Sequence, residues 1–261
     1  MEQTDLIWQV KKDALRRQIT EGKRIDGRKF DEYRKIELIP NFVPNAEGSC
    51  LVKLGKTQVL AGVKMSVMEP YPDQQDSGVI STNAELGPLA SPEFYAGPPD
   101  EDSIETARVV DRGLRESKMI DLEKLCITPK EKVWSVMIDL HILDHDGNLI
   151  DAASLAATKA LLNAYIPKYE DEKVVLGTKD KKLPVKDKPV SSTFAKIAGR
   201  NVLDPILEET KIMDSRMTFV TMENGYLCAG QKGGTGPYTK KEMDEMFDVA
   251  LVEGKKMRKL L

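Results

Sequence analysis

The junction between a strand-like and a helix-like segment reads Asp146-Gly147-Asn148-Leu149-Ile150-Asp151-Ala152-Ala153-Ser154. Residues 136–143 alternate apolar and other side chains as a strand does, and the residues from Ala152 onward are rich in Ala and Leu, as a helix is. Helix N-termini offer free N–H groups and a positive dipole end to anions. Here Asp151 adds a negative charge, and no Arg, Lys or Thr faces the turn. The segment therefore has the outline of a phosphate-binding turn without the groups that bind phosphate.

This turn resembles the DGGTRTAS turn of the RNase PH family, which are phosphorolytic 3′ exoribonucleases. Residues 24–28 (RIDGR) resemble the family's N-terminal RxDGR, and residues 105–115 resemble its EIQRLIGRSLR helix. Without a gap, Ile150 falls where the family has its phosphate-binding Arg, and Asp151 falls on the adjacent Thr. The similarity spans most of the chain. Within that family it also resembles the non-catalytic RNase PH-like ring subunits of the archaeal exosome, which carry the same DGNLIDAAS turn.

A second segment, residues 203–210, resembles the family's LDLDYEED, whose two acids support metal-assisted chemistry. Asp204 occupies the first acidic position, but Thr210 replaces the second acid. A neutral hydroxyl cannot hold a hard divalent cation alone. The resemblance thus predicts a degenerate former phosphate and acid site made of Ile150, Asp151, Asp204 and Thr210, with no catalytic residue, no metal and no cofactor. Compensation by nearby acids remains an alternative: Glu208, Glu209 and Asp214.

Arginines recur on one face of a helix predicted over residues 103–118. Glu105, Arg108, Arg112 and Arg115 fall at i, i+3, i+7 and i+10, so three guanidiniums share a stripe. Arginine presents a fork of donors that suits phosphate oxygens. The alternative is a solvated face paired internally, as Glu105–Arg108, Asp111–Arg115 and Arg112–Glu116. Resemblance to the family's RNA-contacting helix favours RNA binding by Arg108, Arg112 and Arg115.

Composition bounds the class of protein. At 261 residues with 41% hydrophobic side chains, the chain can form one large domain or two smaller halves. Its net charge of −3 gives no global attraction to nucleic acid, so any polyanion site must be a local basic patch. Three widely spaced cysteines argue against a disulfide framework. The acidic first five residues lack the pattern of a signal peptide, so we expect a cytoplasmic protein.

Periodicity predicts an α+β fold. The resemblance specifies an RNase PH-like fold of two pseudo-repeated halves, in which mixed β-sheets pack with α-helices. We expect an N-terminal helix over 1–23, with Leu6, Val10 and Ala14 on its apolar face, a first half over 24–167, a charged connection over 168–188 and a C-terminal half over 189–261. The expected strands are 33–39, 49–54, 57–68, 133–145, 189–197, 200–203, 212–222 and 226–230. The expected later helices are 103–118, 151–166 and one capped by Thr239 and Glu242 in a capping box.

Other motifs have simpler interpretations. Gly55-Lys56-Thr57 lies between two strands and indicates a hairpin turn rather than a phosphate-binding loop. His141 and His145 would point to one face of a strand about 13 Å apart, too far to share a zinc ion. Residues 230–236 indicate a glycine-rich link into the last helix.

The resemblance implies a catalytically silent ring subunit. Its partner would be an active RNase PH-like subunit that performs phosphorolytic 3′–5′ RNA degradation, in a hetero-hexamer built as a trimer of heterodimers. Proteins with S1 or KH domains would cap the ring, and single-stranded RNA would pass through it. One alternative is that this chain is itself a phosphorolytic or metal-dependent nuclease using Asp204, Glu208 and Asp214. A second alternative is a stand-alone RNA-binding module.

Overall fold

The structure, a computed structural model, describes residues 3–261, with side chains from residue 11 onward. Helix α1 (Gln3–Thr20) agrees with the expected N-terminal helix, and Gly22 follows it with φ +86°. Ala14, expected on its apolar face, is exposed, whereas Leu15 and Ile19 are buried. The side chains of Leu6 and Val10, which the sequence places on its apolar face, lie outside the described residues, as do residues 1 and 2. Within the described part of the chain, no helix is long and apolar enough to cross a membrane.

The first half forms a six-stranded mixed sheet. Its order is β1-β2-β3-β6-β4, and β5 pairs with β6 at one end. Every pairing is antiparallel except that of β4 with β6. The strand bounds are β1 (Ile36–Pro40), β2 (Gly48–Leu54), β3 (Thr57–Met68), β4 (Val79–Leu86), β5 (Cys126–Thr128) and β6 (Lys132–Asp144), and the short 3₁₀ helix η1 spans Leu122–Leu125.

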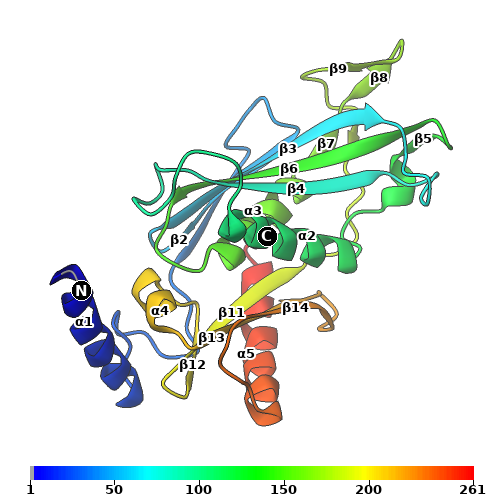
Figure 1. The fold of residues 1–261 in the computed structure, drawn as a ribbon. Coiled ribbons are helices and arrows are strands. Elements are labelled where there is room, and N and C mark those ends of the chain that lie inside the picture. Colours follow the sequence, from blue (N-terminus) through cyan, green and yellow to red (C-terminus); the bar gives the residue numbers. More distant parts are fainter. Residues whose placement is uncertain (1–2) are drawn as a thin grey trace.

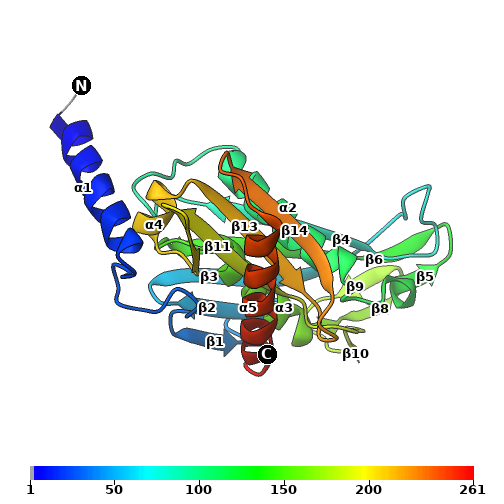
Figure 2. The same cartoon turned by 90° about the horizontal axis from the view of Figure 1, so that it is seen from below.

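The second half forms a four-stranded antiparallel sheet in the order β12-β11-β13-β14. Its elements are β11 (Val190–Ile197), β12 (Arg200–Leu203), α4 (Leu207–Ile212), β13 (Ser215–Thr221), β14 (Leu227–Gly234) and α5 (Lys240–Arg258). Helices α2 (Glu101–Glu116) and α3 (Leu149–Leu162) lie between the two sheets, and α5 lies beyond the second sheet (Figure 1). Figure 2 shows α1 extending from the body beside α4.

Helix α3 is the centre of the core because it is buried on nearly all sides. Eleven of its fourteen residues are buried, and it contacts β2 and β3 of the first sheet and β11 of the second. Small side chains such as Ala153 and Ala157 allow both sheets to approach it closely. The phosphate-like turn at the start of α3 is therefore held at the boundary between the two halves.

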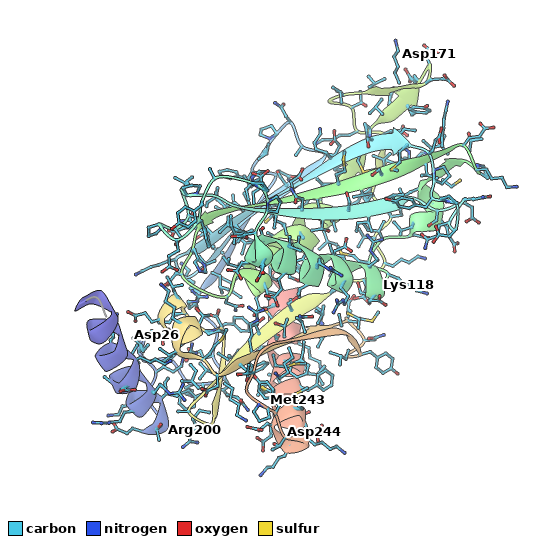
Figure 3. All side chains as sticks on the ribbon, in the orientation of Figure 1. Asp26, Lys118, Asp171, Arg200, Met243 and Asp244 are labelled. Atoms are coloured by element: carbon cyan, nitrogen blue, oxygen red, sulfur yellow. The ribbon has the colours of Figure 1, made fainter. Side chains whose placement is uncertain are left out.

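The connection between the halves carries a projecting hairpin. Strands β8 (Lys168–Glu170) and β9 (Lys173–Val175) pair with each other, and β7 (Tyr165–Ile166) pairs with β10 (Lys181–Lys182). Asp171 lies at the hairpin tip, away from both sheets (Figure 3).

Several sequence-based boundaries were wrong. Strand β4 was not predicted, and the segment expected as a strand from residue 212 begins in helix α4. Helix α2 starts earlier than expected because Asp100, not Ser103, is its N-cap and accepts from the Ser103 N–H at 2.9 Å. Helix α3 spans 149–162 rather than 151–166.

The two histidines also differ from expectation, because they do not share one strand. His141 lies on β6 and faces Glu85 at 3.1 Å, whereas His145 follows the end of β6 and stacks on Phe94.

Candidate functional site

Helix α2 presents its arginines on the face opposite its apolar one. Val110 and Leu114 are buried against the sheets, while Arg108, Arg112 and Arg115 are exposed. The helix runs beside two edge strands, β4 of the first sheet and β14 of the second. The predicted stripe therefore exists as a surface along the boundary of the two halves.

The three guanidiniums of the stripe have different partners. Arg115 donates from Nε to Asp111 Oδ2 at 2.9 Å and from Nη2 to the Ile80 carbonyl of β4 at 2.6 Å. Arg112 Nη1 donates to the Gln231 side chain of β14 at 3.2 Å. Within residues 3–261, no hydrogen bond or ion pair is found for Arg108. Arg108 and Arg112 are thus the two whose donors remain largely free for a ligand.

The alternative of internal pairing is correct for one pair and wrong for two. Asp111 pairs with Arg115, as that alternative proposed. Glu105 instead pairs with Arg216 of β13 at 2.6 Å, which leaves Arg108 without it. Arg112 contacts Gln231 rather than Glu116. A shallow groove of about 350 Å³ runs between Arg108, Arg112 and Gln231.

The turn before α3 is packed against the second half instead of facing solvent. Gly147 has φ +86°, and a Cβ there would come within 2.5 Å of the Ile206 carbonyl carbon, so a side chain is excluded. Asn148 is the N-cap residue in the left-handed region, with φ 50°. Ile150, at the family's arginine position, is 4% exposed.

Asp151 points into the protein, not toward an anion at the turn. Its carboxylate accepts from the Tyr33 hydroxyl at 2.7 Å, from the Asn148 amide at 2.9 Å and from Thr193 N–H and Oγ1 at 2.9 and 2.7 Å. Burial raises the pKa of Asp151, although these hydrogen bonds oppose the shift. The expectation that its charge faces the turn was therefore wrong. Asp151 instead links α3 by hydrogen bonds to Tyr33, which precedes β1, and to Thr193 of β11.

Asp204 is enclosed by cationic and amide donors. Arg34 forms a two-pronged pair with it, from Nη2 to Oδ1 at 2.7 Å and from Nε to Oδ2 at 2.9 Å. Arg28 Nη1 donates to Oδ2 at 2.9 Å, and Asn148 Nδ2 donates to Oδ1 at 2.7 Å. Burial opposes ionisation of Asp204, but Arg34 and then Asn148 outweigh it and lower the pKa of this carboxyl. Both carboxylate oxygens are already engaged by protein donors.

The other residues of the predicted acid site do not replace it. The Thr210 hydroxyl donates to the Leu207 carbonyl of its own helix at 2.7 Å. Each neighbouring acid has a cation partner: Lys11 for Glu208, Arg24 for Glu209 and Arg16 for Asp214. Among the described residues, no group of three His, Cys, Asp or Glu side chains could hold a metal ion.

A hollow of about 220 Å³ remains next to the turn. Its walls include Asn148, Ile150, Thr193 and Thr210, and also Glu105 and Arg216. The structure thus brings Ile150 and Thr210 to one small cavity, while Asp151 and Asp204 lie behind it in a polar network with Asn148 between them.

The RxDGR segment explains how this network is held. Arg24 is buried with Glu209, donates to the carbonyls of Leu203 and Asp204 at 2.9 Å each, and so fixes the loop that carries Asp204. Asp26, which lies between α1 and the second sheet (Figure 3), orients Arg28 through a 2.6 Å ion pair. Sequence reasoning missed Tyr33, Arg34, Asn148 and Thr193. The motif's two arginines were the one local signal for a buried carboxylate partner.

Comparisons with known proteins identify the family of this chain. Residues 32–167 match the model of 3′ exoribonuclease family domain 1, and residues 187–253 match that of domain 2. The exosome complex component Rrp42 of Archaeoglobus fulgidus is 50% identical over 97% of this chain and 96% of its own length. Rrp42 of Thermococcus gammatolerans is 48% identical over 100% of this chain and 97% of its own length.

Solved structures give the same grouping. A chain of the Archaeoglobus fulgidus exosome with RNA bound to the active site has a TM-score of 0.92 and 49% identity, covering 97% of this chain and 98% of that one. A chain of an archaeal exosome core has a TM-score of 0.88 and 45% identity, with 99% of each chain covered. Rice Rrp46, at 18% identity and a TM-score of 0.68 over 90% and 97%, shares the fold.

Proposed function

Since this chain belongs to the 3′ exoribonuclease family of RNase PH, and within it to the archaeal exosome components, we propose that it is the catalytically silent subunit of that complex. Its partner in the proposal is an active RNase PH-like subunit, three copies of each alternating in a hexameric ring. The partner performs phosphorolytic 3′–5′ degradation, and S1- or KH-domain proteins cap the ring.

The observation that carries the silent assignment is the enclosure of Asp204. A carboxylate that supports metal-assisted chemistry must offer free lone pairs to a cation. Asp204 gives its oxygens to Arg28, Arg34 and Asn148 and is 0% exposed. A divalent ion would have to displace two guanidiniums from a buried site.

The proposed contribution to RNA is made by Arg108 and Arg112. They line one groove, are exposed, and can each donate two bonds to phosphate oxygens. The net charge of −3 means that RNA affinity depends on this local surface and on the partner that completes the channel.

The silent assignment is tested by incubating the chain alone, the partner alone and the assembled ring with 5′-labelled RNA, phosphate and Mg²⁺. We expect the chain alone to leave RNA intact and the ring to shorten it. Shortening by a homogeneous preparation of this chain alone would overturn the proposal and favour the nuclease alternative.

The RNA assignment is tested with Arg108→Gln and Arg112→Gln in the assembled ring. Each lost phosphate contact should reduce the salt slope of RNA binding by about 0.7. Lys173→Gln is a matched control because Lys173 lies on the remote β8–β9 hairpin. An unaltered affinity and slope in both arginine variants would remove the RNA role from this helix.

A further inference from the structure

Three polar atoms with no partner of their own lie on residues that line one small cavity. We call the hollow of about 220 Å³ beside the turn before α3 the turn cavity, and its walls include Asn148, His145 and Arg216. Asn148 Oδ1, His145 Nδ1 and Arg216 Nε are each buried and have no hydrogen-bond partner among the described residues. A buried polar atom without a partner costs free energy. Three such atoms around one cavity therefore indicate a ligand that completes their hydrogen bonds.

The positions of these atoms are fixed by the surrounding structure. Asn148 is 7% exposed, and its amide nitrogen donates to Asp151 at 2.9 Å and to Asp204 at 2.7 Å, behind the cavity. Because both bonds are made by the nitrogen, the amide oxygen is turned away from the two carboxylates and toward the cavity. The ring of His145 stacks on Phe94, with ring centroids 5.2 Å apart. A ligand would therefore meet groups that are already ordered, which lowers the entropic cost of binding.

The charges around the turn cavity favour a neutral ligand. Arg216 brings a positive charge to the wall, but Glu105 pairs with it at 2.6 Å. Asp102 adds a negative charge to the same wall. Burial lowers the pKa of His145 from its ordinary 6.5, so its imidazole is neutral at neutral pH. An anion would be buried here without a free counter-charge, which is unfavourable.

Hydroxyl groups match the three atoms chemically. A hydroxyl both donates and accepts, so it can donate to the Asn148 oxygen and accept from the Arg216 Nε–H. It suits either tautomer of neutral His145, because Nδ1 accepts in one tautomer and donates in the other. The side chains of Leu86 and Met213 give the cavity apolar walls that suit a short carbon chain. Since a water takes up about 30 Å³ in the liquid, the cavity has room for a small molecule with several hydroxyls.

We propose that the turn cavity binds a small neutral polyol, whose hydroxyl groups form hydrogen bonds with Asn148, His145 and Arg216. The carbon chain of the polyol packs on the apolar walls. This inference goes beyond the proposed function, because binding in the turn cavity requires neither RNA nor a second subunit. It assigns a ligand of different chemistry to the place where sequence similarity predicts a former phosphate site.

The test titrates the 261-residue chain with glycerol and follows the ring protons of its two histidines by NMR at constant pH. His145 lines the turn cavity, whereas His141 faces Glu85 on the first sheet and is an internal control. A His141→Gln variant identifies the two sets of signals. We expect the His145 signals to shift and to saturate with a dissociation constant on the order of 1 mM, as suits a ligand of this size. The His141 signals should not shift, and phosphate should not shift those of His145.

A variant that fills the cavity tests its location. Thr210 lines the turn cavity, and its hydroxyl donates to the Leu207 carbonyl of its own helix. Thr210→Leu places a larger side chain there and should raise the dissociation constant for glycerol about 10-fold or more. Thr20→Leu is the matched control, because the exposed Thr20 also donates to a carbonyl of its own helix, that of Arg16. This control should change the constant less than about 2-fold.

Three results would overturn the inference. A His145 shift that is linear, or that accompanies an equal shift of His141, would show only the effect of glycerol on the solvent. Unchanged His145 signals would assign the three atoms to water alone. A saturable shift with phosphate instead of glycerol would show that the cavity takes an anion. Each of these results is separate from the phosphorolysis test, so the proposed function and this inference can fail independently.

Discussion

Asp204 links the two halves through its carboxylate. Its carboxylate joins Arg28 and Arg34 of the N-terminal segment to Asn148 at the start of α3. A buried carboxylate with two guanidiniums is stable only while the partners remain together, because removal of one leaves unpaired buried charge. Asp204, which sequence similarity aligns with a catalytic acid of the family, therefore has a structural role here.

We expect Asp204→Asn to lower the free energy of unfolding by about 3–5 kcal/mol, because Arg34 and Arg28 lose their counter-charge. The rate of RNA phosphorolysis per assembled ring should be the same as for the wild type. Urea unfolding and a phosphorolysis assay on the same preparation measure both quantities. Glu208→Gln is the control, because its carboxylate is more than a third exposed and the change should cost less than about 1 kcal/mol. Loss of turnover with unchanged stability would contradict this prediction.

Asp204 and Asp151 should affect the pH dependence of stability in opposite directions. The pKa of Asp204 is lowered from its ordinary 3.8, so its stabilisation is present above that value and lost as pH falls through the lower folded pKa. The pKa of Asp151 is raised, so ionisation costs stability as pH rises from 3.8 through the higher folded pKa. Unfolding curves from pH 3 to 7 give the free energy of unfolding of wild type, Asp204→Asn and Asp151→Asn. The difference between wild type and Asp204→Asn should grow as pH rises, and the difference between wild type and Asp151→Asn should shrink.

At the scale of elements, α2 has one side that packs on the two halves and one side that we propose binds RNA. Arg115 blocks part of the β4 edge by bonding the Ile80 carbonyl, a group that an edge strand otherwise leaves unpaired. Arg108 and Arg112 face the groove next to β14. The three arginines look equivalent in sequence, but their neighbours differ: Arg115 bonds the edge of β4, whereas Arg108 and Arg112 face the groove.

Arg115→Ala should consequently reduce stability more than RNA affinity. Loss of the Ile80 hydrogen bond and of a half-exposed ion pair should cost about 1 kcal/mol. Arg112→Ala should instead reduce RNA affinity more than stability. Thermal melts and RNA titrations of the assembled ring measure the two effects, and an equal loss of RNA affinity in both variants would show that all three arginines act alike.

Elements with strong local signals were predictable from sequence, and those without were not. The bounds of β3 and β12 and the Thr239–Glu242 capping box of α5 were predicted correctly. Strand β4 was missed because its exposed positions carry Ser81, Asn83 and Glu85, which have low strand preference. Helix α4 has six residues, too few for a helical period to be recognised.

At the scale of the whole molecule, the candidate site was only half predictable. Ile150, Asp151, Asp204 and Thr210 were found through their positions in motifs. Their partners were not, because Arg34 and Asp204 are 170 residues apart and Asp151 and Thr193 are 42 apart. Contacts of that kind depend on the packing of one half against the other, which no local pattern encodes.

Reinstating the family's residues should not restore a phosphate site. Ile150→Arg, Asp151→Thr and Thr210→Asp together place a guanidinium where Ile150 is buried and leave the Tyr33 hydroxyl and Thr193 N–H without their acceptor. We expect calorimetry to detect no phosphate binding and the melting temperature to fall. Millimolar phosphate affinity at an unchanged melting temperature would contradict this prediction.

The enclosed Asp204 also has a consequence for descent. A lineage can lose a catalytic group by one neutral substitution and regain it by another, as long as the residues around that group have not changed. Because Arg28, Arg34 and Asn148 hold the carboxylate, a substitution that freed it for other chemistry would also leave buried charge unpaired and lower stability. In the proposed ring, this cost makes a return to catalysis unfavourable and keeps the lineage dependent on the active partner.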